Sequence, residues 1–148
     1  MTKQKVLGIV QKYGTRDPQV IAEAMGIIVI FPLLDSDTMM GLCARILNRK
    51  VIVCNGFLES TARTLVLAHE LGHALQHGGV NAFILRDETL FPPGKIENQA
   101  NRFAAELLIP DSLFAEYAGC TAEEIAYAED LHPKLFEYKI LDPFNTDF

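Results

Sequence analysis

The stretch from Leu65 to His77 constrains this chain more than any other. It reads LVLAHELGHALQH, and its apolar residues would lie on nearly every side of a helix, as expected for a buried one. Gly72 weakens such a helix by about 1 kcal/mol relative to alanine, and a close backbone neighbour would explain its presence. We therefore predict a buried central helix that begins near Glu59 or Ser60 and ends before Gly78.

Within this helix, residues 69–73 form the pattern H-E-x-x-H. His69 and His73 are four residues apart, so their imidazoles lie one turn apart on the same face and can converge on one metal ion. Glu70 follows at about 100° round the helix, which keeps it off the metal but near a metal-bound water. Histidines on an apolar helix are usually core residues, but this spacing favours a zinc site with Glu70 as the general base.

A catalytic zinc site requires three protein ligands and one open position. The sequence offers His77, Glu97 and Glu106 as the third ligand. His77 would be collinear with the other two histidines and cannot help to surround an ion, so we interpret it as a helix-end residue near the C-terminal dipole. Glu97 and Glu106 are about 180° apart on one helix and cannot both face the site. Glu97 shares its face with Asn101, which can orient a ligand as an outer hydrogen-bond partner. This favours Glu97 and leaves Glu106 as a solvent-facing residue.

Composition and charge narrow the class of protein. The 148 residues, 49% of them hydrophobic and 22% charged, fit one folded domain that spans residues 1–148. The net charge of −6 argues against a nucleic-acid-binding surface, and we interpret the basic cluster at Arg45 to Lys50 as a solvated turn. We therefore expect no direct contact with nucleic acid.

Three features favour a cytoplasmic protein without a membrane segment. Gln11 and Lys12 interrupt the apolar N-terminus too early for a signal peptide. The longest apolar run, Ile27 to Leu34, is eight residues long and contains a proline, so it is too short to span a bilayer. The three cysteines are odd in number and lack C-x-x-C spacing, which indicates reduced thiols.

The remaining pattern predicts an α+β fold, with a small antiparallel or mixed sheet packed on helices. Three stretches read as strands: a continuous buried one at Ile27–Phe31, and a hairpin formed by Met40–Leu47 and Lys50–Cys54. Val80–Gly94 reads as a loop or an irregular strand, and the tail from Lys134 to Phe148 as a strand or a turn. Helices are predicted from Val6 to Gly14, from Asp17–Pro18 to Gly26, from Ile96 to Ile109, from Asp111 to Gly119, and from a capping box at Thr121 to Pro133.

The motif of residues 69–73 together with residues 97–110, ENQANRFAAELLIP, closely resembles the ImmA/IrrE family of zinc metallo-endopeptidases. The likeness extends from Asp17 to Pro110. It implies a minimal thermolysin-like (gluzincin) zincin core with one zinc ion per chain. The ligands would be His69, His73 and Glu97, with Glu70 as base. Asn101, which would orient a ligand histidine, stands where related zinc peptidases often hold aspartate. Ile109 stands where methionine is usual.

The resemblance also implies a partner, because family members associated with mobile elements and stress responses cleave the repressor encoded beside them. We recognise no helix-turn-helix or sensor segment in this chain, so we expect the substrate to be a separate DNA-binding repressor. We expect one strand of the hairpin from Met40 to Cys54 to offer a free edge to an extended segment of this substrate. The second oxyanion donor is not identifiable: His77, Tyr117, Tyr127 and His132 are candidates that we interpret as structural.

The alternative to a peptidase is a non-catalytic regulator, stabilised by zinc, that controls such a repressor by contact.

Overall fold

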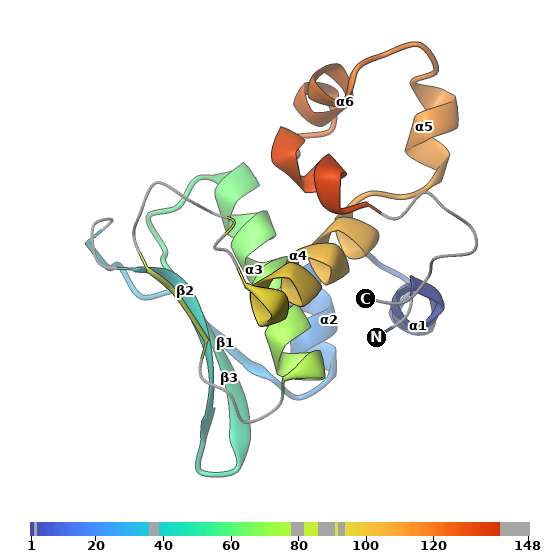
Figure 1. Cartoon of the computed structure of the whole chain (residues 1–148). Helices are drawn as coiled ribbons and strands as arrows, with labels where there is room; N and C mark the ends of the chain where they lie inside the picture. The colour runs from blue at the N-terminus through green and yellow to red at the C-terminus, as the bar shows by residue number, and fades with distance from the viewer. Residues whose placement is uncertain (2, 36–38, 78–81, 86–90, 92–93, 140–148) are drawn as a thin grey trace.

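The central helix predicted from the sequence forms the middle layer of the fold. A computed structural model describes residues 1, 3–35, 39–77, 82–85, 91 and 94–139 of the chain. Helix α3 (Ser60–Gln76) lies between a sheet on one side and helix α4 (Lys95–Leu108) on the other (Figure 1). Its residues 65–74 are all buried, as predicted. None of the helices within the described ranges has the length and hydropathy needed to cross a membrane.

The sheet has four strands in the order β1-β3-β2-β4. They are β1 (Ile28–Ile30), β2 (Met39–Ile46), β3 (Arg49–Cys54) and β4 (Ala82–Leu85). Strand β1 runs parallel to β3, whereas β2 is antiparallel to both β3 and β4. The mixed sheet packed on helices confirms the predicted α+β class.

The predicted hairpin forms, but its position in the sheet differs from our expectation. Leu47 and Asn48 join β2 to β3 with φ values of +48° and +67°, the left-handed conformation that a tight hairpin turn requires. Both strands of the hairpin are internal, because β1 covers the far side of β3 and β4 covers the far side of β2. The expectation that the hairpin offers a free edge to a peptide was therefore wrong, and the outermost strands are β1 and β4.

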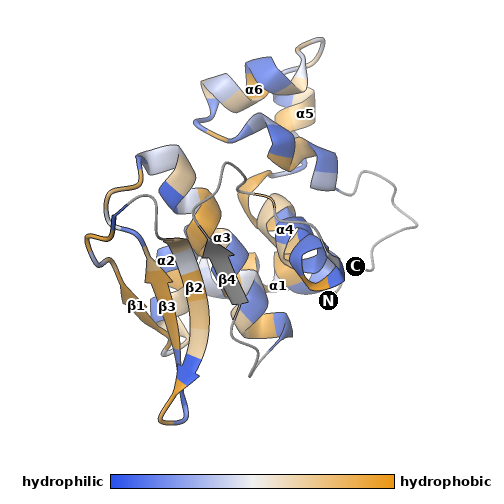
Figure 2. Ribbon diagram, turned by 60° about the vertical axis from the view of Figure 1, so that its left-hand side comes forward, coloured by the Kyte–Doolittle hydropathy of each residue, from blue (hydrophilic) through white to orange (hydrophobic). Residues whose placement is uncertain are grey.

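Strand β1 also differs from its prediction, since we expected it to be buried on both faces. Ile28 and Ile30 are 38% and 45% exposed, because their face of this outermost strand points away from the helices. The orange strands at the left of Figure 2 belong to this apolar sheet. Continuous apolar composition alone does not distinguish an outermost strand from a central one.

Shorter helices surround the central layer, and the ends of three of them follow predicted signals at Gly14, Asp17 and Thr121. Helix α1 (Lys3–Tyr13) ends at Gly14, and Asp17 caps α2 (Pro18–Ala24) by accepting hydrogen bonds from two backbone N–H groups. Thr121 caps α6 (Ala122–Ala128) by accepting from the Glu124 N–H group at 3.2 Å. Helix α5 is Ser112–Glu116.

Two segments were left ambiguous by the sequence. The tail forms a 3-10 helix, η1 (Pro133–Tyr138), rather than a strand, and its residues 140–148 lie outside the described part. Strand β4 is the strand anticipated within Val80–Gly94, whose residues 80–81, 86–90 and 92–93 also lie outside it.

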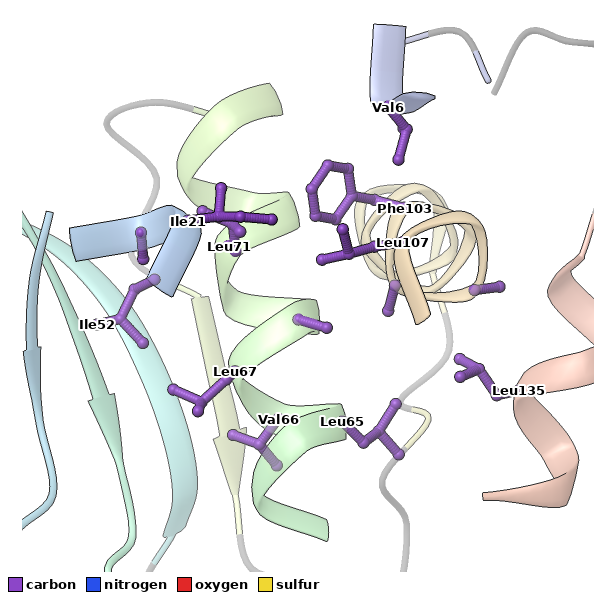
Figure 3. Close-up of a cluster of buried hydrophobic side chains, with 14 of the residues drawn as sticks. Val6, Ile21, Ile52, Leu65, Val66, Leu67, Leu71, Phe103, Leu107 and Leu135 are labelled. Atoms are coloured by element: carbon purple, nitrogen blue, oxygen red, sulfur yellow. The ribbon is translucent and has the colours of Figure 1, made fainter. Parts of the chain in front are cut away.

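The hydrophobic core lies on both sides of α3 (Figure 3). Leu67 of α3 and Ile52 of β3 fill the space between helix and sheet, whereas Phe103 and Leu107 of α4 point toward α3 from the opposite side. Leu135 of η1 packs beyond α4 and is 1% exposed. Because α3 is packed on two faces, its position and its rotation about its own axis are both fixed. A site built from its polar side chains requires both to be fixed.

Gly41 of β2 permits the close approach of α3 to the sheet. A Cβ atom at this position would lie 2.5 Å from Cγ1 of Val66 and 3.0 Å from the carbonyl oxygen of Val53. Val66 is 1% exposed and β-branched, so it has little freedom to move aside.

We predict that Gly41→Ala lowers the free energy of unfolding by about 1–3 kcal/mol, because overpacking a close-packed core has this cost. Urea denaturation measures the change. Gly8→Ala is the matched control, since a Cβ atom at Gly8 of α1 would meet nothing within 4 Å. The control should raise stability by up to about 1 kcal/mol through helix propensity. Equal stability of the two variants would contradict the close approach of α3 to β2.

Candidate metal centre

Three side chains from two helices converge on one point. The Nε2 atoms of His69 and His73, both on α3, lie 3.0 Å apart. The Oε2 atom of Glu97, in the first turn of α4, lies 2.7 Å from Nε2 of His69 and 3.1 Å from Nε2 of His73. The histidines are 0% and 1% exposed, and the Glu97 side chain is 18% exposed. The structure thus brings together the three residues that the sequence predicted as ligands.

The chemistry and spacing of these atoms fit a metal ion. Two imidazoles and one carboxylate are a donor set that zinc accepts, and ligands 2.0–2.1 Å from a tetrahedral zinc lie roughly 3.3 Å from one another. Hydrogen bonds alone explain the close approach of these three side chains less well than a metal ion does. A neutral histidine carries only one ring proton, and the three close contacts compete for it. The group can therefore hold a divalent cation with one face left for another ligand.

The packing of α3 on α4 positions these side chains. A Cβ atom at Gly72 would lie 3.2 Å from Cα of Ala100 and 3.1 Å from Cδ1 of Phe103, so this glycine has the close backbone neighbour that we anticipated. The close crossing brings the first turn of α4, with Glu97, against the histidine-bearing face of α3.

Asn101 of α4 fixes the orientation of the first histidine. Nδ1 of His69 lies 2.7 Å from Oδ1 of Asn101, which can only accept a hydrogen bond. His69 therefore carries a proton on Nδ1 and directs Nε2 toward Glu97. Asn101 is fully buried, and its Nδ2 atom has no hydrogen-bond partner among the described residues. Glu97 and Asn101, one turn apart on α4, both contact His69.

The carboxylate of Glu70 lies in the interior of the protein. Glu70 is 0% exposed, and neither of its oxygens accepts a hydrogen bond from any described residue. Burial raises the pKa of Glu70 well above its usual value, and the nearby charge of Glu97 raises it further. A carboxylate in this state needs a proton, a water molecule or a cation beside it.

The pKa of Glu97 shifts in the opposite direction from that of Glu70. Burial alone would raise the pKa of its carboxyl group, but contacts with His69 and His73 outweigh that effect and lower the pKa to about 2. Glu97 is therefore ionised at neutral pH, as a metal ligand must be.

Comparison with known proteins identifies the family. Residues 22–132 match the family described as IrrE N-terminal-like domain, Peptidase M78. The chain belongs to this peptidase family. A curated relative, uncharacterized immunity region protein 2 of Bacillus phage phi105, is 35% identical over 143 residues, covering 95% of this chain and 90% of the relative. Metallopeptidase ImmA of Bacillus subtilis (strain 168) is 26% identical over 142 residues, covering 93% and 83% of the two chains.

In this IrrE N-terminal-like domain, His77 does not join the converging group, in agreement with our interpretation of it as a helix-end residue. It is the C-cap of α3, and its ring contacts His73 on the side away from Glu97, with the two Nδ1 atoms 3.0 Å apart. Its Nε2 atom lies 2.7 Å from Oε1 of Gln99 on α4. Sequence reasoning did not identify Gln99, because its contact with His77 depends on how α3 and α4 pack.

The prediction that Glu106 faces solvent was wrong. Glu106 is 0% exposed, and its Oε2 atom lies 2.7 Å from Nζ of Lys139 and 3.6 Å from Nζ of Lys3. Both lysines also contact Asp111, whose side chain therefore pairs with them and makes no cap hydrogen bond to α5. Glu106 lies among α1, α5 and the end of η1, and those contacts could not be foreseen from the periodicity of α4 alone.

Of the other candidates for a second oxyanion donor, Tyr117 and His132 have structural contacts and Tyr127 is exposed. The hydroxyl group of Tyr117 donates to Glu129 at 2.7 Å, and Tyr127 is 92% exposed. His132 caps η1 by accepting from the Lys134 N–H group at 3.2 Å, and its ring packs on Phe91 with a centroid distance of 5.0 Å. These contacts fit the structural interpretation given from the sequence.

We predict that Glu106→Ala destabilises the fold by about 1–3 kcal/mol, because it removes the buried partner of the Lys139 ammonium group while Asp111 still contacts that group. Chemical denaturation of the purified variant measures the loss. Glu116→Ala, at an exposed position in the last turn of α5, is the control and should change stability by less than about 0.5 kcal/mol. Equal effects of the two substitutions would contradict the buried ion pair.

Proposed function

We propose that this protein is a zinc-dependent endopeptidase that acts in the cytoplasm as a single domain of residues 1–148. His69, His73 and Glu97 hold one zinc ion per chain, Glu70 is the general base, and Asn101 orients His69. Membership of a metallopeptidase family and the convergence of the three side chains support this assignment.

The observation that carries the proposal is the state of Glu70. A site that only stabilised the fold would have no use for a fully buried carboxylate whose oxygens lack partners among the described residues. Burying an unpaired carboxyl group lowers the stability of the fold. Its presence here therefore supports a chemical role. Its position in α3, next to His69 and near Glu97, is the one that a base acting beside a metal ion would require.

The chain's own residues then have defined roles in peptide hydrolysis. A bound zinc ion would polarise the scissile carbonyl group and make an attacking water molecule more acidic. Glu70 accepts a proton from that water and delivers it to the nitrogen of the leaving amine. The raised pKa of Glu70, caused by burial and then by Glu97, makes it a better proton acceptor than an exposed carboxylate. Asn101 accepts a hydrogen bond from Nδ1 of His69 and so directs Nε2 of that ring toward the ion.

The proposed substrate is a DNA-binding helix-turn-helix repressor of a mobile element or stress regulon. The name of the phage phi105 relative, an immunity region protein, supports a setting of this kind. The chain's net charge of −6 argues against direct binding of DNA, so an effect on transcription would act through another protein. An extended segment that adds as a strand would pair with β1 or β4, the outermost strands of the described sheet.

We predict that Glu97→Ala no longer retains zinc through dialysis, whereas Glu106→Ala retains one equivalent in its folded fraction. The reason is that Glu97 contacts both histidines, while Glu106 contacts two lysines. Metal analysis of the two purified variants beside the wild-type protein measures the difference. Retention by Glu97→Ala together with loss by Glu106→Ala would reverse the assignment of the third ligand.

We predict that Glu70→Gln folds and binds zinc normally but cleaves its substrate ~10²-fold to 10⁴-fold more slowly, the usual contribution of a general base. The substitution preserves the shape of the side chain and removes only its ability to take the proton. Mass spectrometry of a helix-turn-helix repressor encoded near this protein, incubated with each form and zinc, measures the products. Undiminished cleavage by Glu70→Gln would disprove the role of Glu70.

The same experiment tests the function as a whole. Wild-type protein should cut the repressor within a linker or another exposed segment, since a folded domain cannot extend along a strand edge. A repressor that binds the zinc-loaded protein but stays intact, even with any required activating signal supplied, would instead support the non-catalytic regulator that acts by contact.

A further inference from the structure

We propose that His77 and Gln99 form a positioning chain for the second histidine of the centre, so that α4 orients both ligands of α3. This inference rests on the metal site of the proposed function. It assigns a role to two residues outside the converging group, neither of which contacts the reacting atoms.

The direction of the hydrogen bonds is set at the far end of this chain. Oε1 of Gln99 can only accept, so Nε2 of His77, 2.7 Å away, must donate. With its proton on Nε2, His77 presents Nδ1 as an acceptor. That atom lies 3.0 Å from Nδ1 of His73, so His73 carries a proton there and donates it. Nε2 of His73 is thereby the ring nitrogen that faces Glu97 and His69.

Burial makes this arrangement important for His73. Its side chain is 0% exposed, so the Nδ1–H group has little access to a substitute partner in the solvent. A buried donor without a partner costs about 1–3 kcal/mol. His77 satisfies that donor, and it is itself held by its backbone N–H group, which donates to the carbonyl oxygen of His73 at 2.8 Å.

The two histidines of the centre are therefore supported from the same helix by different means. Asn101 accepts directly from His69, whereas Gln99 acts on His73 through His77. Gln76 strengthens the link by donating from Nε2 to the backbone carbonyl groups of Gly72 and Gln99, both at 3.3 Å. Helix α4 thus supplies a ligand, the outer partner of His69, and Gln99, which acts on His73 through His77.

The first test is the affinity of the intact protein for zinc, measured by competition with a chromophoric chelator. His77→Phe should weaken binding by about 10-fold to 100-fold, the usual cost of losing an outer partner of a ligand. Gln99→Leu should weaken it by about 10-fold. Gln99→Glu keeps the acceptor and should bind at least as tightly as the wild-type protein. Gln11→Leu, at an exposed position on α1, is the matched control and should bind unchanged.

The second test does not depend on metal binding. Nitrogen-15 NMR of the imidazole rings in the metal-free protein should show a proton on Nδ1 of His73, and His77 protonated on Nε2 alone. In Gln99→Leu the preference of His77 should be lost, while Gln99→Glu should restore it. Gln99→Leu also covers the case in which His77→Phe fails to fold.

The outcomes separate the two claims. If wild-type protein binds zinc and both His77→Phe and Gln99→Leu bind it equally well, the positioning chain is wrong and the proposed function stands. If wild-type protein binds no zinc, the proposed function fails, and the ring-nitrogen spectra alone decide the chain. A His77 ring with its proton on Nδ1 would overturn the inference in either case.

Discussion

The close crossing of α3 and α4 at Gly72 is the constraint on which the candidate centre depends. Neither helix carries a complete set of ligand groups, because two imidazoles are on α3 and the carboxylate is on α4. A Cβ atom at Gly72 would lie 3.1–3.2 Å from atoms of Ala100 and Phe103, so these neighbours would have to give way by a few tenths of an ångström. Since the three converging atoms lie only 2.7–3.1 Å from one another, a shift of about 1 Å would be enough to disperse them.

The same packing places several polar and charged side chains in the interior of the protein. His69, Glu70, His73, Asn101 and Glu106 are all buried, although they lie on the two helices that carry most of the hydrophobic core. Burying such groups is costly unless they are paired. The histidines, Asn101 and Glu106 have partners, but the Glu70 oxygens and Asn101 Nδ2 have none among the described residues. Buried Nε of Arg63 and Oε1 of Gln76 also lack a partner among the described residues, so three of these five atoms lie at the candidate centre. A stability cost kept for function is expected at such a site.

Much of the fold and the site could be predicted from the sequence, because their signals are local. Spacing within α3 predicted that His69 and His73 share a face, and the cap residues Asp17 and Thr121 predicted where two helices begin. Gly72 indicated a close neighbour before that neighbour was known. Each of these inferences needs only the geometry of one helix and its ends.

The errors concern contacts between distant parts of the chain. Glu106 was placed in solvent because the partners Lys3 and Lys139 lie at opposite ends of the sequence. The hairpin was expected to offer an edge, because nothing in its own residues predicts that β1 and β4 would flank it. The contact of Gln99 with His77 escaped notice for the same reason, since it exists only once α4 lies against α3.

X-ray absorption at the zinc edge of the purified, zinc-loaded protein tests the central claim most directly, because it measures the ligands without relying on activity. The account predicts nitrogen and oxygen ligands at about 2.0–2.1 Å, with the multiple scattering of two imidazole rings. Cys43, Cys54 and Cys120 are all free thiols, so the chain also contains the donors for a different kind of site. A sulfur shell at about 2.3 Å, or the signature of fewer than two imidazoles, would contradict a centre built from His69, His73 and Glu97.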